Sequence, residues 1–162
     1  MLFRSKTVRH WVALCDAESL PKDSGIPNLV SYEGWIGAEN GQYQWPVFDE
    51  RLAAGLCYTS GTTGDPKGVL YSHRSTTLHA YAGSLPDSTF LSARDCILPV
   101  VPMFHVNAWG VPYSAPMMGA KVVWPGAALD GKSIYELMEA EQVTCAAGVP
   151  TVWLGLLNHL AS

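Results

Sequence analysis

The chain has 162 residues, of which 48% are hydrophobic and only 15% are charged, and its formal net charge is −4. This length is typical of one domain with a sizeable core, and the mildly acidic balance argues against a nucleic-acid-binding face. The charged fraction lies below the usual quarter. It indicates either deep burial or apolar surface, and we expect exposed apolar surface to promote self-association as a homo-oligomer.

The cysteines lie far apart in the sequence and form no C-x-x-C pair, so a zinc or redox motif is not indicated. They fall in or beside apolar runs, which is typical of small buried hydrophobes and fits a reducing, cytoplasmic setting. The first residues lack the apolar run of a signal peptide. The uncharged stretch 96–120 contains several prolines, which argue against a transmembrane segment.

The first 50 residues predict little regular structure. Residues 7–15 are rich in β-type residues and indicate a strand. Residues 16–30 indicate a loop, residues 30–36 are ambiguous, and residues 37–50 indicate a surface excursion, because Gly and Pro recur among polar residues.

A glycine- and hydroxyl-rich loop at 58–72 follows an apolar strand at 53–58. Glycine lets the backbone approach a ligand, and successive N–H groups in such turns bind anions. Hydroxyls add donors and a lysine adds a mobile charge, so the loop predicts a polyphosphate site. Its residues are Thr59, Ser60, Gly61, Thr62, Thr63, Gly64 and Lys67.

Two other interpretations of this loop are weaker. The Walker spacing G-x-x-x-x-G-K-[ST] fails, because Asp65 and Pro66 separate Gly64 from Lys67 and a glycine follows the lysine. A flexible Gly/Ser/Thr linker is less favoured, because the stretch lies between two ordered patterns rather than between domains.

Strands and helices alternate after residue 50. Ser72 can cap a helix that runs to about Gly83. Strands are predicted at 96–100, 120–124 and 143–147, and helices at 104–118 (bent at Pro112), at 133–141 and from Pro150 onward. This alternation predicts an α/β fold with a mostly parallel sheet flanked by helices. The loops at 58–68, 101–105 and 148–150 each follow a strand, so we expect them at one sheet edge, where ligands bind.

Three histidines lie in or near the two motifs. His105 lies amid apolar residues at 102–110, where a satisfied core histidine is the default, but its place after a strand raises the odds of a functional role. His73 and His79 are six residues apart and point in different directions on a helix. No metal ligand is therefore assigned to the protein.

Residues 58–69 resemble the signature loop of the adenylate-forming enzymes, which include acyl-CoA synthetases, firefly-type luciferases and peptide-synthetase adenylation domains. This resemblance implies that the loop binds the triphosphate of ATP, with Mg²⁺ carried by the nucleotide. Residues 102–110 resemble the family's second core motif, which implies that His105 lies in the acyl-substrate pocket, beside the carboxylate or the acyl end of the substrate. The implied wall residues of the acyl pocket are Phe104, Val106, Trp109, Gly148, Val149 and Pro150, and a short helix is implied at 31–35.

Residues 54–160 together resemble a medium- or long-chain fatty-acid–CoA ligase. This implies two steps: the carboxylate attacks the α-phosphorus of ATP, and the thiol of CoA then displaces AMP. No acidic partner for a substrate amine is evident near residues 102–110, which disfavours an amino acid. A luciferase-like or aromatic-acid ligase stays open. A further hypothesis is that Trp109 plugs the empty acyl channel.

The resemblance also implies the domain organisation. Residues 1–162 would form part of the large N-terminal domain, with a leading segment at 1–50 and an αβ repeat at 51–162, and without the small C-terminal domain. The adenine- and ribose-binding motifs of the family are not in this sequence. We therefore expect the chain alone not to complete the reaction. A non-catalytic binding or assembly module is the alternative.

Overall fold

The computed structural model describes residues 7–59 and 64–162. The chain divides into two compact units, residues 1–47 and 48–162. In the first unit, β1 (Trp11–Ala13) pairs in parallel with β2 (Leu29–Ser31), and α1 (Tyr32–Ile36) follows. The Ser31 side chain accepts a hydrogen bond from the Gly34 N–H at 3.1 Å and caps this helix. The short helix is confirmed, whereas β2 was not predicted; it lies across the end of the predicted 16–30 loop and the start of the ambiguous segment 30–36.

A parallel three-stranded sheet forms the core of the second unit. Its order is β6-β5-β7, with β5 (Cys96–Val100) in the centre, β6 (Lys121–Val122) on one side and β7 (Cys145–Gly148) on the other. Successive strand residues face opposite sides. Leu98 packs with residues of α5 (Gly131–Glu141) and α6 (Pro150–Leu160), whereas Ile97 packs with residues of α4 (Val111–Met118). The predicted parallel sheet flanked by helices is confirmed for this part of the chain.

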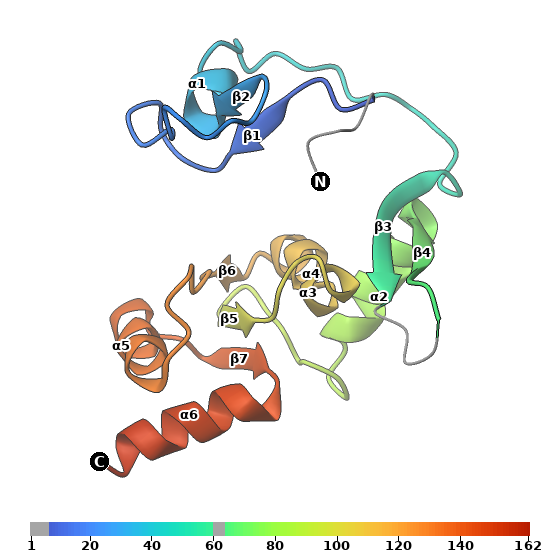
Figure 1. Cartoon of the computed structure of the whole chain (residues 1–162). Helices are drawn as coiled ribbons and strands as arrows, with labels where there is room; N and C mark the ends of the chain where they lie inside the picture. The colour runs from blue at the N-terminus through green and yellow to red at the C-terminus, as the bar shows by residue number, and fades with distance from the viewer. Residues whose placement is uncertain (1–6, 60–63) are drawn as a thin grey trace. The chain divides into compact units, whose positions relative to one another are not determined.

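The predicted loop at 58–72 is partly wrong. β3 (Ala53–Thr59) pairs antiparallel with β4 (Lys67–Ser72), and the two form a separate two-stranded sheet (Figure 1). The run 67–72 carries β-branched, aromatic and aliphatic residues that suit a strand, but the glycine-rich motif before it concealed this pattern. β3 is therefore not a strand of the parallel sheet, so the single-edge argument does not apply to the residues that follow it.

The predicted helix at 104–118 is interrupted. It comprises a short turn, α3 (Val106–Trp109), and then α4, with Gly110 between them at φ +79°. Pro112 lies in the first turn of α4, where its missing N–H costs nothing. The break therefore occurs at Gly110 and not as a bend at Pro112.

The helix after the hairpin is confirmed. α2 (His73–Ser84) begins after Ser72, whose side chain forms a reciprocal capping box with Ser75. It packs against α4. Among the described residues, no helix is long and apolar enough to cross a membrane.

Candidate functional site

The hairpin β3–β4 places two of the predicted phosphate-binding residues opposite each other. Thr59 ends β3, Lys67 begins β4, and the two pair across the ladder. The Thr59 hydroxyl donates to the backbone carbonyl of Lys67 at 3.4 Å. Ser60, Gly61, Thr62 and Thr63 lie outside the described residues. Gly64 has φ +102°, a conformation that favours glycine. The hairpin thus brings a hydroxyl and an exposed ammonium group to the base of the loop.

The second motif forms a left-handed turn directly after the central strand. Val106, Asn107, Ala108 and Trp109 have φ between +48° and +56°, and Gly110 has φ +79°. L-residues other than Gly, Asn and Asp pay roughly 1–2 kcal/mol each for this conformation. Such a run persists only where the surroundings hold it, and strained backbone of this kind clusters at ligand sites. The turn is therefore a candidate functional element.

Two side chains from other elements hold this turn. The Cys57 thiol of β3 donates to Oδ1 of Asn107, with 3.2 Å between the sulfur and oxygen atoms. Nε2 of His79, on α2, donates to the backbone carbonyl of Trp109 at 3.3 Å. The Asn107 amide also packs over Gly55, where a Cβ would lie at an ordinary contact distance of 3.6 Å from Nδ2. The phosphate-loop hairpin and the second motif therefore meet through side chains, and not through a shared sheet edge.

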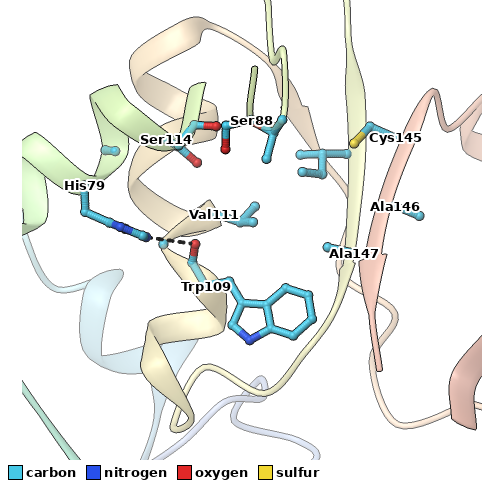
Figure 2. A pocket seen from close by; sticks show the side chains of 13 residues that line it. His79, Ser88, Trp109, Val111, Ser114, Cys145, Ala146 and Ala147 are labelled. Carbon is cyan, nitrogen blue, oxygen red and sulfur yellow. Dashed lines mark hydrogen bonds between the residues drawn. The ribbon is translucent and has the colours of Figure 1, made fainter. Parts of the chain in front are cut away.

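A cavity of about 260 Å³ lies between this turn and the parallel sheet. Figure 2 shows His79 and Trp109 on one side of it and Cys145 and Ala147, from β7, on the other. Val111 and small residues complete an apolar wall. Ser88, Thr89 and Ser114 add hydroxyls and Cys145 adds a thiol. The cavity can therefore hold an apolar group with few polar contacts.

The thiol of Cys145 stays protonated in this setting. Burial raises its pKa, with a smaller contribution from the negative charge of Asp95. A thiol with a raised pKa is a poor nucleophile, since the thiolate is the reactive form. Cys145 thus contributes a small, weakly polar surface to the cavity wall.

The predicted acyl-pocket residues do not all line one cavity. Trp109 lines the cavity near β7, whereas Val106 lines a second one near β4. The Phe104 side chain is 81% exposed and His105 is also exposed. The carbonyl of Gly148 accepts from Nε1 of Trp153 at 3.1 Å. A Cβ at Gly148 would come within 2.9 Å of that ring, so this glycine is needed for packing. Val149 is exposed, and Pro150 opens α6.

Sequence reasoning missed Cys57, His79 and Asn107 as residues that join the site. His79 was considered only as a metal ligand, and among the described residues no cluster of three potential metal ligands occurs. Asn107 carried a usable signal, because Asn is one of the few residues that adopts the left-handed conformation readily. Its place three residues before Gly110 could have indicated a turn.

Three comparisons relate this chain to known proteins. Residues 5–162 match the family described as AMP-binding enzyme. The chain is 63% identical over 132 residues to a medium-chain-fatty-acid–CoA ligase of Ectopseudomonas oleovorans, covering 82% of this chain and 24% of that protein. It is 51% identical over 157 residues to a long-chain-fatty-acid–CoA ligase of Thermus thermophilus, covering 97% of this chain and 27% of that protein.

The fold also matches solved structures. An o-succinylbenzoate coenzyme A synthetase of Bacillus subtilis, in complex with ATP and magnesium ion, superimposes with a TM-score of 0.68 at 22% identity, over 80% of this chain and 27% of that one. The chain thus spans about a quarter of the length of the curated relatives it matches. With the family match over nearly its whole length, the chain belongs to the AMP-binding enzyme family.

Proposed function

We propose that this chain is the part of an ATP-dependent fatty-acid–CoA ligase that holds the triphosphate and the acyl group. The observation that carries the proposal is the hairpin β3–β4, in which Thr59 and Lys67 face each other at the base of the glycine- and threonine-rich loop. The 63% identity to a medium-chain ligase supports a fatty acid as the carboxylate substrate.

The hairpin's task in this proposal is electrostatic. When the carboxylate attacks the α-phosphorus of ATP, negative charge builds up on the departing pyrophosphate. Lys67 neutralises part of that charge, and the hydroxyls and N–H groups of the loop donate to the β- and γ-phosphate oxygens. Mg²⁺ enters with the triphosphate, as is usual for this cation, and it supplies further charge neutralisation. CoA is the thiol substrate of the second step.

The cavity of about 260 Å³ is the proposed acyl site. Its wall near Trp109 and Val111 is apolar, so it favours an alkyl chain over a charged side chain. Trp109 contributes the largest aromatic surface and is the proposed plug of the channel. Trp109→Ala should therefore change chain-length preference far more than it changes ATP affinity. An unchanged preference would refute this role.

The decisive experiment measures ATP–pyrophosphate exchange with a panel of fatty acids. It uses the Ectopseudomonas ligase in which the matching segment is replaced by that of this chain. Lys67→Ala should lower the exchange rate about 10²–10³-fold, as expected for loss of one transition-state contact. Lys132→Ala is the matched control, because Lys132 is an exposed lysine on α5 whose nearest acidic partner is Glu136.

The outcomes separate the competing functions. Exchange with fatty acids that depends on Lys67 supports the ligase. Exchange with aromatic acids instead would favour an aromatic-acid or luciferase-like enzyme. ATP or pyrophosphate binding to the 162-residue chain, without exchange in the chimera, would favour a non-catalytic binding module. No binding and no exchange would refute the proposal.

We also propose a cytoplasmic location and self-association of the protein. All four cysteines are free thiols in the structure, which supports a reducing compartment. Large apolar side chains such as Leu70 and Phe104 are well exposed, which supports contact with further protein surface.

A further inference from the structure

A second cavity, of about 240 Å³, lies among β4, α2, the left-handed turn and α4. Its lining includes Tyr71 of β4, Thr76 of α2, Val106 and Asn107 of the turn and Tyr113 of α4. It shares only two lining residues, His79 and Gly110, with the cavity near β7. The two spaces therefore adjoin each other at His79.

The imidazole of His79 lies against Gly110 at this junction, and His79 as a residue is solvent-exposed. A Cβ at Gly110 would lie 2.6 Å from Cδ2 of His79 and 2.8 Å from Nε2, so the ring lies directly against the glycine backbone. The hydrogen bond from Nε2 to the Trp109 carbonyl fixes its orientation (Figure 2). The next residue, Ala80, is buried at 1% exposure, which anchors α2 behind the ring.

The volumes of the two cavities suggest that they are parts of one ligand pocket. Ligand pockets usually have about 300–1,000 Å³, and each of the two cavities is smaller than this range. Joined, they would fall within it. His79 is the one side chain larger than hydrogen that lines both cavities, so shortening it is the change we expect to join them.

We propose that His79 is the partition of the acyl site and determines how long a chain the ligase accepts. The inference rests on the proposed function, since it assigns the cavity near β7 to the acyl group. His79 acts by occupying volume at the end of that cavity, while its hydrogen bond to the Trp109 carbonyl keeps the ring in place.

The test is the chain-length profile of kcat/KM in ATP–pyrophosphate exchange, measured in the same chimera with saturated fatty acids of increasing length. His79→Ala should raise the ratio of kcat/KM for longer over shorter acids by about tenfold or more, since each methylene in an apolar pocket is worth about 10–200-fold. His79→Phe retains the ring volume without the donor and should keep the unmodified profile. His79→Trp enlarges the partition and should shift the preference to shorter acids.

Three results would overturn the inference. One is an unchanged profile in His79→Ala with exchange intact. Another is a shift in His79→Phe that matches His79→Ala while His79→Gln restores the original profile, because that would assign selectivity to the hydrogen bond. The third is an unchanged profile in His79→Trp, which also decides the case if His79→Ala fails to fold in thermal unfolding. Absence of exchange with every acid in the unmodified chimera would instead refute the proposed function.

Discussion

The hairpin β3–β4 and the central strand β5 carry the two motifs of this site in opposite environments. Every residue of β5 is buried, whereas most residues of the strands β3 and β4 are exposed, and Cys57 is the one buried residue of these two strands. The side chains of β5 thus pack in the core, so they are not available to a ligand. In this part of the chain, the turn after β5 is the candidate for ligand contact. In the hairpin the side chains remain free for a ligand.

The largest expected effect tests this contrast in stability. Leu98→Ala removes a side chain with 0% exposure from the sheet core and should lower the free energy of unfolding by roughly 2–5 kcal/mol. Leu70→Ala, in the hairpin at 66% exposure, should change it by about 0.5 kcal/mol or less. Urea unfolding of the chain, followed by tryptophan fluorescence, measures both.

The contrast would fail if the two variants lost similar stability. A large loss in Leu70→Ala would mean that the exposed face of the hairpin is covered by further structure in solution. Equal small losses would mean that β5 is not the core strand. Leu56→Ala, on β3 and also exposed, serves as a second hairpin variant.

The same contrast explains which parts of the fold could be predicted from the sequence. Residues 96–100 form a short apolar run. Strands of a parallel sheet that are buried on both faces consist of such runs, so this pattern predicts a central strand. The strand β5 therefore has the predicted bounds. The helix predicted at 133–141 likewise corresponds to α5, which packs Ile134, Leu137 and Met138 into the core on one face.

The errors arose where local pattern and tertiary structure differ. The strand Lys67–Ser72 was missed because the glycine-rich motif before it drew the whole stretch into a predicted loop, although its residues suit a strand and pair with β3. The apolar run 104–118 predicts one helix, but the left-handed turn inside it depends on contacts from Cys57 and His79, which lie 50 and 30 residues away from their partners. Periodicity alone cannot report contacts at that separation.

The next prediction concerns the link between the two regions. Asn107→Leu removes the acceptor for the Cys57 thiol and places a residue that disfavours φ +50° in the turn. The expected loss in the free energy of unfolding is about 1–2 kcal/mol. Asn107→Asp keeps both the acceptor and the tolerance of the left-handed conformation, so it is the matched control.

A double-mutant cycle isolates the contact itself. Cys57→Ala and Asn107→Leu should be non-additive by about 0.5 kcal/mol or more, as expected for residues in contact. In the chimera, Asn107→Leu should also weaken ATP binding, because β3 leads into the phosphate loop. Additive stability losses with unchanged ATP binding would show that hairpin and turn are energetically independent.

The smallest expected effect is the dependence of the sheet on pH. Asp95 precedes β5, and its carboxylate accepts from the hydroxyl and N–H of Ser92 at 2.7 and 2.8 Å and from the Thr144 hydroxyl at 3.0 Å. These bonds, the Ser92 hydroxyl first, lower the pKa of Asp95 below its usual 3.8. Thr144 immediately precedes β7, so the carboxylate joins the entries of two neighbouring strands.

The sign of the effect follows from linkage. A carboxyl group with a lowered pKa in the folded state binds protons more weakly there than in the unfolded chain. Its stabilisation is thus fully present above the unfolded value, and it is lost as pH falls through the lower folded value. Asp95→Asn should flatten the acid limb of the stability profile, which starts near pH about 5 and continues as pH falls through the lowered pKa of Asp95. Ser92→Ala, which removes the largest cause of the shift, should flatten it partly.

Urea unfolding at a series of pH values measures this contribution, with hydrogen exchange at the amides of β5 and β4 as the regional readout. Acid should weaken protection in β5, where Asp95 lies at the strand entry, before it weakens protection in the hairpin. If Asp95→Asn leaves the acid limb unchanged, the carboxylate does not couple the strands, and the acid sensitivity of the sheet must come from another group. The next candidate is Asp130, whose pKa is also lowered, chiefly by the Ser133 hydroxyl at the start of α5. If Asp130→Asn flattens the acid limb where Asp95→Asn does not, Asp130 is the source of the acid sensitivity.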